Sequence, residues 1–221
     1  TIGWLIKIVY PLVWISTRLT KMFSNDKENE ITRQEIIALA SISHREGALL
    51  SQENEYLTNL LNLHEIKTDQ ILTPRSVMHT LDESISVTEA LNHPKSAQFT
   101  RIPTFEGTTD NIKGKIIRAD LYEAERHGKG DSPISDFAHA IFRVSERLPV
   151  QKLLDMFIKK RAHLFIVEDE FGQTAGVVSL EDAIETLLGR EIVDEKDTVE
   201  DLQAFARTQY RDRLRDAKEK S

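Results

Sequence analysis

The sequence predicts an α+β protein in which one module of strands and helices occurs twice in tandem. The first observation is a repeat: from Ile71 onward, the order strand, helix, strand, hairpin, strand, helix recurs with a period of about 60 residues. The second is the apolar spacing, which changes from alternation in the strands to i, i+3, i+4 spacing in the helices. The third is length, because 221 residues with 40% hydrophobic residues can bury a core. We expect the copies to form a pseudo-two-fold pair with a cleft between them.

The first 24 residues differ in composition from the rest of the chain. Aromatic residues stand among aliphatic ones, the only charges are basic, and Lys7 and Pro11 interrupt the apolar run. A bilayer crossing needs about 20 apolar residues in succession, and this stretch falls short of that. Aromatic and basic residues around a short apolar segment favour an amphipathic helix in the membrane interface. Packing of the same helix against a partner protein is the alternative.

A helical connector follows the polar linker at residues 24–30. Thr32 and Glu35 have the spacing of a capping box, which predicts a helix that ends near Gly47. Ser51 is expected to cap a second helix. The carboxylates of that second helix are expected on a solvated face.

The two copies divide into matching elements. In the first we predict strands at 76–81, 99–106 and 112–117, and helices at 86–91 and 118–128. In the second we predict strands at 141–145, 163–167 and 175–179, and helices at 150–158 and 180–189. Gly114 then aligns with Gly176 and Asp120 with Asp182, once a one-residue difference in the hairpin turn is allowed for.

These elements divide the chain into five parts. They are a juxtamembrane amphipathic segment (1–24), the helical connector (25–67), a first module (68–130), a second module (131–197) and a charged helical tail (198–221).

Charge and cysteine content exclude some functions. The formal net charge of −7 argues against a nucleic-acid partner, because phosphate binding needs an excess of Lys and Arg on one face. The absence of cysteine excludes disulfides and thiolate metal sites, and it fits a reducing compartment.

The stretch from Gly176 to Asp182 is the strongest candidate for a site. Ser179 stands where a strand becomes a helix, and Asp182 lies in the first turn of that helix. Backbone N–H groups and the positive end of a helix favour phosphate, and a carboxylate can accept both hydrogen bonds of a ribose diol. The simpler alternative is that Ser179 is an N-cap and that Asp182 favours the helix dipole.

Catalytic and metal-binding interpretations are weaker. A nucleophile needs a base within reach, and nothing pairs His163, at the start of a strand expected to be buried, with Ser179. Glu168, Asp169 and Glu170 are consecutive in a hairpin turn and should point apart, so they do not converge on a metal. We therefore expect a protein that binds a ligand without changing it, and not an enzyme.

The tandem copies resemble a pair of cystathionine-β-synthase (CBS) domains, also called a Bateman module. The motif of that family is Gly, two apolar residues, Thr or Ser, any two residues, then Asp, which residues 176–182 match. More specifically, residues 71–75, 99–103 and 163–197 resemble the cyclin M and CorC family of magnesium-transport membrane proteins. The resemblance covers residues 31–197, and residues 10–16 resemble the juxtamembrane helix of that family.

The resemblance implies an adenine-nucleotide site that takes ATP with Mg²⁺. It assigns Ser179 to the hydroxyl position and Asp182 to the ribose. It places Phe99 on the adenine, Arg101 near the phosphates and Thr73 beside the base.

The first copy departs from the motif, because Ile117 stands in place of the hydroxyl residue. We therefore expect one nucleotide per chain. Arg75 is a weaker second candidate for a phosphate cation.

The resemblance also implies where the chain works and with what. The expected partners are adenine nucleotide, an upstream transmembrane domain that is absent from this chain, the membrane surface through residues 1–24, and a second copy in a homodimer. The stripe of Ala183, Leu187 and Leu188 is a candidate for the dimer surface, or it packs within the pair. The whole protein would lie in the inner or plasma membrane, with this region on the cytoplasmic side. The alternative function is a free-standing CBS-pair regulator that binds AMP or ATP and controls a partner protein.

Overall fold

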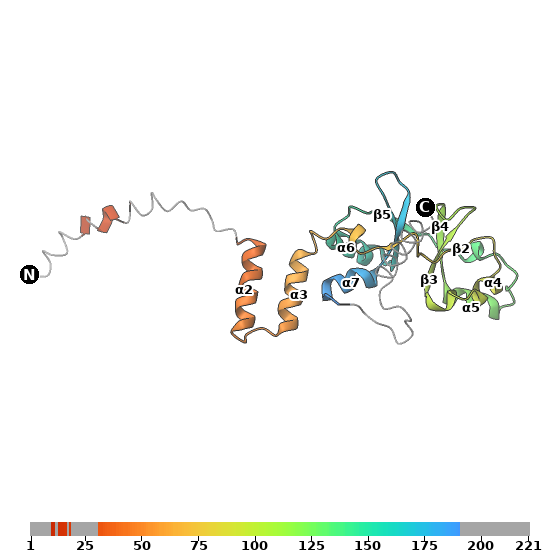
Figure 1. Cartoon of the computed structure of the whole chain (residues 1–221), viewed down its shortest axis with the longest axis horizontal. Coiled ribbons are helices and arrows are strands. Elements are labelled where there is room, and N and C mark those ends of the chain that lie inside the picture. The colour runs from red at the N-terminus through yellow and green to blue at the C-terminus, as the bar shows by residue number, and fades with distance from the viewer. Residues whose placement is uncertain (1–9, 12, 17, 19–30, 191–221) are drawn as a thin grey trace, which may run out of the picture.

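The computed structural model describes residues 10–11, 13–16, 18 and 31–190 (Figure 1). Most of the amphipathic segment predicted for residues 1–24, and the helical tail predicted for residues 198–221, lie outside the described residues.

The connector is a helical hairpin. Helix α2 spans Arg33–Arg45, and its N-cap Thr32 forms the predicted capping box with Glu35. Helix α3 spans Ser51–Asn62 and packs against α2. Ser51 is the first residue of α3 and not its cap, because Leu50 holds the cap position.

The first module is built on a three-stranded sheet in the order β2-β3-β4. Its strands are β2 (Leu81–Asp82), β3 (Arg101–Phe105) and β4 (Ile112–Ile117), and its helices are α4 (Val87–Asn92) and α5 (Arg118–Arg126). Short 3-10 turns, η2 (Ser96–Gln98) and η3 (Ile134–Phe137), complete it. Ile102 and Ile116, both almost fully buried, point from the sheet into the core beneath the helices.

The second module has a four-stranded sheet in the order β1-β7-β6-β5. Strands β5 (Phe142–Ser145), β6 (Leu164–Glu168) and β7 (Thr174–Ser179) are joined by β1 (Thr73–Pro74), and the helices are α6 (Val150–Lys160) and α7 (Leu180–Leu188). Another 3-10 turn, η1 (Thr68–Gln70), precedes β1. Phe157 and Phe165 stack at 4.2 Å in the core. Figure 1 shows the two sheets between the helices of the two modules.

The register confirms the predicted repeat. Thr104 pairs with Gly114 in the first sheet, Val167 pairs with Gly176 in the second, and each ladder shifts register at the next residue. The two copies therefore share their strand pairing as well as their order of elements.

The modules exchange short segments. Strand β1 precedes the strands of the first sheet but pairs with β7 of the second, with Thr73 opposite Val177. In the same way His139, which precedes the first strand of the second module, β5, bridges to Lys115 of β4. A Cβ on Gly176 would lie 2.2 Å from the Thr73 carbonyl oxygen, so this close approach of two backbones requires the glycine.

The strand predicted at residues 76–81 is wrong except at its last residue. The backbone turns after β1, where the N–H groups of Val77 and Met78 donate to the Pro74 carbonyl, and β2 begins only at Leu81. The physical reason is the exchange: because β1 belongs to the other sheet, the chain must turn before it can enter its own.

Candidate functional site

Three of the predicted site residues lie on or beside the C-terminal half of β7 and the start of α7. Ser179 is the last residue of that strand and the N-cap of α7, and Asp182 lies in the first turn of the helix. Thr73 comes alongside through β1, because its partner Val177 is two residues before Ser179. Thr73 therefore lies beside β7, more than a hundred residues later in the sequence, because β1 pairs with the sheet of the second module.

Ser179 and Asp182 are tied to each other. One carboxylate oxygen of Asp182 accepts hydrogen bonds from the Ser179 backbone N–H at 2.6 Å and from its hydroxyl at 2.8 Å. The Asp182 N–H in turn donates to the Ser179 hydroxyl oxygen at 3.1 Å. This is a capping box, so the simpler role considered above is present in the structure. It also holds the carboxylate at the positive end of α7, where a ligand hydroxyl could exchange with that of Ser179.

Phe99 is the end of an aromatic stack. Its ring lies 5.4 Å from that of His79 at 26°, and His79 lies 4.8 Å from His93. Burial lowers the pKa of His79 to about 4, and electrostatic repulsion from the neighbouring His93 and Lys95 adds to this effect. The imidazole is therefore neutral at pH 7, and one face of Phe99 is already covered by a flat, uncharged ring.

Arg101 lies on the face of the first sheet opposite its core. Directly paired residues of an antiparallel ladder project to the same side, and side chains alternate along a strand. Arg101 pairs with Ile117 and Pro103 with Lys115, whereas Ile102 and Ile116 between them point into the core. Arg101 and Lys115 therefore share the face that looks away from α4 and α5.

Lys115 is a functional candidate that sequence reasoning missed. It is only 8% exposed, and its pKa is lowered by burial first and then by the charge of Arg101. Within residues 31–190 no acidic partner of Lys115 is described. The sequence feature that could have indicated it is the position of a lysine between Gly114 and Ile116, in the middle of a strand. Lysine is rarely buried at such a position unless it has a partner.

Arg75, the other predicted phosphate cation, is already paired with an acidic residue. It forms an ion pair with Asp110 of the β3–β4 hairpin, and its backbone N–H donates to Ala175. Its charge is therefore already balanced, and Lys115 is the better second cation.

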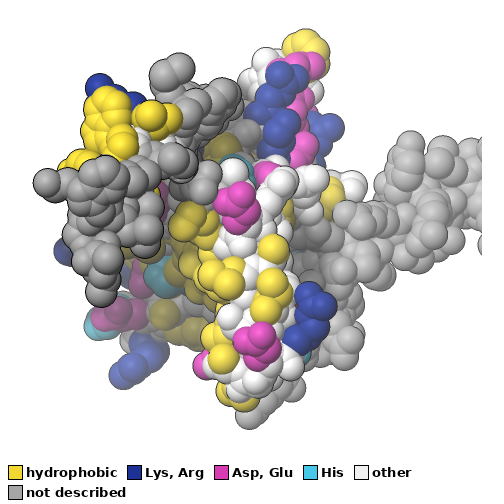
Figure 2. Space-filling model, turned by 90° about the vertical axis from the view of Figure 1, so that its left-hand side faces the viewer, with side chains coloured by type: hydrophobic (Ala, Val, Ile, Leu, Met, Phe, Trp, Pro, Cys, Tyr) yellow, Lys and Arg dark blue, Asp and Glu magenta, His cyan; other side chains and the backbone are white. Residues whose placement is uncertain are grey.

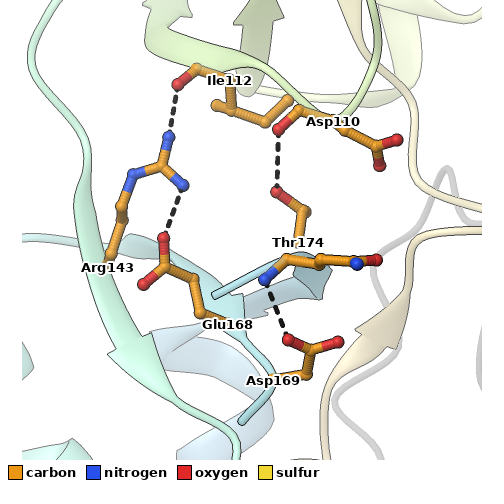
Figure 3. A network of polar contacts seen from close by, with 7 residues as sticks. Asp110, Ile112, Arg143, Glu168, Asp169 and Thr174 are labelled. Atoms are coloured by element: carbon orange, nitrogen blue, oxygen red, sulfur yellow. Dashed lines mark hydrogen bonds and ion pairs between the residues drawn. The ribbon is translucent and has the colours of Figure 1, made fainter. Parts of the chain in front are cut away.

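Polar contacts join the hairpin of the first module to the second (Figure 3). Arg143 of β5 donates to Glu168 at 2.8 Å and to the Ile112 carbonyl, and the Thr174 hydroxyl donates to the Asp110 carbonyl at 3.3 Å. These bonds fix the relative position of the two sheets.

The carboxylates of the second hairpin turn have structural partners. Glu168 pairs with Arg143, Glu170 pairs with Arg147, and Asp169 accepts from two N–H groups of its own turn. They point apart, and the described part of the chain holds no cluster of three or more acidic or histidine side chains placed for a metal. His163 is exposed just before β6, and its carbonyl accepts from Leu180.

The matching place in the first module holds a histidine paired with the carboxylate. His139 holds the position that Thr73 holds in the second, and its Nε2 lies 2.7 Å from Asp120, the counterpart of Asp182. Ile117 supplies no hydroxyl there. A cavity of about 570 Å³ opens beside this pair along α5.

Comparison with known proteins identifies the modules. Residues 134–189 match the model of the CBS domain. The UPF0053 protein sll1254 of Synechocystis is 34% identical over 201 residues, which cover 90% of this chain and 58% of that protein. The CBS domain of the bacterial CNNM/CorC family Mg²⁺ transporter superposes with a TM-score of 0.69 at 29% identity, over 74% of this chain and 99% of that one. This chain belongs to the CNNM/CorC family.

Another structure of the CNNM/CorC CBS domain was solved in complex with ATP. It is 29% identical, with a TM-score of 0.60, and covers 63% of this chain and 99% of that one. The present chain spans 58% of the length of its Synechocystis relative. None of the helices in the described residues is long and apolar enough to cross a membrane.

Proposed function

We propose that this CNNM/CorC chain is the regulatory module, on the cytoplasmic side of the membrane, of a magnesium or other divalent cation transporter, and that it binds ATP with Mg²⁺. The observation that supports the proposal is the capping box of Ser179 and Asp182 at the N-terminus of α7, on the strand that pairs with β1 and its Thr73. The ATP complex of a related CBS domain supports the choice of ligand.

The donor set fits a nucleotide. Asp182 offers a carboxylate to the ribose hydroxyls, and Ser179 and the start of α7 offer a hydroxyl and N–H groups. Arg101 and Lys115 supply two cations on one sheet face for the phosphates. Phe99 offers an aromatic ring to the base, with Thr73 beside it.

The charges of the chain and of the nucleotide are the reason to expect Mg²⁺ with ATP. A triphosphate brings several negative charges to a chain whose formal net charge is −7. Mg²⁺ bound mainly by phosphate oxygens and water needs few protein ligands, so it could neutralise the ligand without a protein metal site. Binding of the ion and of the nucleotide would then be linked.

Helix α7 connects the proposed site to the connector. It begins at the Ser179–Asp182 capping box and packs against α3. Just beyond its C-terminal end, Arg190 donates to the Tyr56 hydroxyl of α3 at 2.9 Å. A shift of α7 on ligand binding would therefore reach the hairpin, and through it the membrane-surface segment at residues 1–24 and an upstream transmembrane domain.

A homodimer of two CBS pairs is part of the proposal. Ala183 is buried in the core, and Leu187 packs against it, so the stripe named above contributes to the fold of its own module. Light scattering at micromolar concentration should give the mass of a dimer, and a monomer with and without ATP would contradict this part.

The test of the proposal uses the internal repeat as its own control. Isothermal titration calorimetry with ATP and Mg²⁺ should give about one site per chain. Asp182→Ala should weaken ATP about ten- to a hundred-fold, the effect of losing a carboxylate's hydrogen bonds. Asp120→Ala, at the matching place where the carboxylate already pairs with His139, should leave affinity unchanged. Two equal sites, or equal effects of the two substitutions in folded proteins, would refute the assignment.

A further inference from the structure

The helical hairpin α2–α3 carries an apolar surface that the described residues leave uncovered. Its exposed members are Ile31, Leu39, Ile42, Leu50 and Leu60, which we call the hairpin surface. Leu39 is 63% exposed and Leu60 is 51% exposed, although both stand in helices that pack on each other. Figure 2 views the molecule from the side of the hairpin and shows hydrophobic side chains among charged ones there.

The spacing on α2 places two of these residues together. Leu39 and Ile42 are three residues apart and lie on one side of a helix of 3.6 residues per turn, and Ile31 stands just before the N-cap of the same helix. Large aliphatic side chains gathered on one helix side and left in water mark an interaction surface more than scattered ones do.

The chain itself contains a segment with a matching apolar stripe. Residues 198–221 lie outside the described residues, and their sequence places apolar side chains at i, i+3, i+7, i+11 and i+15. These are Val199, Leu202, Ala206, Tyr210 and Leu214.

The chain leaves α7 on the surface of α3. A Cβ on Gly189 would lie 2.6 Å from Asn59 and 2.8 Å from Glu55, and Arg190 bonds to Tyr56. The seven residues 191–197 can span at most about 25 Å. A helix of 12 residues such as α3 is about 18 Å long, so the segment can reach any part of the hairpin.

Charge favours the same pairing. Between residues 31 and 65 the hairpin carries five glutamates against two arginines. Between residues 207 and 220 the tail carries six basic residues against three acidic ones. The surplus charges are opposite in sign and flank the two apolar stripes, which favours their association.

We propose that residues 198–221 pack as an amphipathic helix on the hairpin surface and complete a three-helix bundle with α2 and α3. None of the residues assigned to the nucleotide belongs to the hairpin surface or to the tail. In this arrangement the C-terminal tail covers the apolar residues of the connector, and α7 and the tail hold α3 from two sides.

Hydrogen exchange of the full chain, read by mass spectrometry over residues 33–45, tests this packing. Leu202→Glu places a charge in the tail's apolar stripe and should speed amide exchange in α2 at least about tenfold. Thr208→Glu adds the same charge on the opposite side of the tail helix and should leave exchange in α2 unchanged. Equal exchange in all three proteins would overturn the proposal.

Two further measurements separate other occupants of the hairpin surface. If a second copy covers the surface, protection of α2 should fall on dilution, and that result would also overturn the proposal. If the N-terminal segment covers it, Trp14→Glu should remove the protection while Leu202→Glu does not, with the same consequence. Because the chain has no cysteine, a nitroxide label on Gln209→Cys, beside the apolar stripe and not in it, offers a direct readout. It should broaden the methyl signals of Leu39 and Ile42 in the protein diluted with unlabelled chains, and unbroadened signals would contradict the packing.

Discussion

Lys115 is a buried cation on the sheet face that it shares with Arg101. Keeping two positive charges together in a poorly solvated place lowers the lysine pKa, and this cost is offset when an anion binds between them. Lys115→Met should therefore weaken ATP about tenfold, the effect of losing one charge-assisted contact, and AMP much less. Calorimetry with both nucleotides measures the difference.

Lys113 provides the control for that experiment. It stands on the same strand, but its ammonium pairs with Glu106 at 2.8 Å on the surface. Lys113→Met should change neither affinity, and a loss equal to that of Lys115→Met would mean that only overall charge matters.

His79 should make stability depend on pH. Its pKa is about 4 in the folded protein, against 6.5 for the free side chain, because burial and the nearby His93 and Lys95 disfavour the charged form. The unfolded chain therefore binds a proton first, and stability falls as the pH drops from about 6.5 toward 4. In the described residues its Nε2 is also buried without a hydrogen-bond partner.

The variant His79→Phe should keep the stack and remove this titration. Urea unfolding at pH 7 and pH 5 should show a smaller loss of stability than in the wild type. His127→Phe, at an exposed position, should behave like the wild type. An unchanged pH dependence in His79→Phe would show that the imidazole is protonated normally.

At the scale of the elements, β4 and β7 carry a glycine at the same position of the repeat, Gly114 and Gly176. Each glycine marks the place where another backbone segment passes close to its strand. A Cβ at Gly176 would meet the Thr73 carbonyl oxygen at 2.2 Å, and one at Gly114 would meet the His139 carbonyl oxygen at 2.7 Å. Gly176→Ala should lower the free energy of unfolding by about 2–3 kcal/mol, because a backbone must move. Gly114→Ala should cost less, about 1–2 kcal/mol, since its contact is longer. Urea denaturation compares them, and the reverse order would contradict this account.

The same elements show what could be predicted from the sequence. The capping box at Thr32, the α6 and α7 helices and the match of Gly114 to Gly176 follow from local spacing, and the structure confirms them. The strand at residues 76–81 was wrong because β1 pairs with a strand far along the chain, which local alternation does not reveal. Ser179 and Asp182 could be located from their motif, whereas Lys115 depends on which face of β4 meets the other module.

For the molecule as a whole, charge links nucleotide to ion. The net charge of −7 opposes an unneutralised triphosphate, while Arg101 and Lys115 offset only part of it. ATP affinity should therefore rise when excess Mg²⁺ replaces EDTA, and AMP affinity should respond less. Titrations of both nucleotides in both conditions provide the check. Equal ATP binding with and without the ion would remove magnesium from the site.

The exchanged strand β1 also sets the order in which the protein can be completed during synthesis. Thr73 leaves the ribosome 104 residues before its partner Val177, which is about 5 to 20 seconds of translation at about 5–20 residues per second. Within that interval the first module can assemble its own sheet as soon as β4 has been made, while β1 still has no strand to pair with. The second sheet, and the nucleotide site proposed at its edge, can therefore form only after nearly the whole CBS pair has been made.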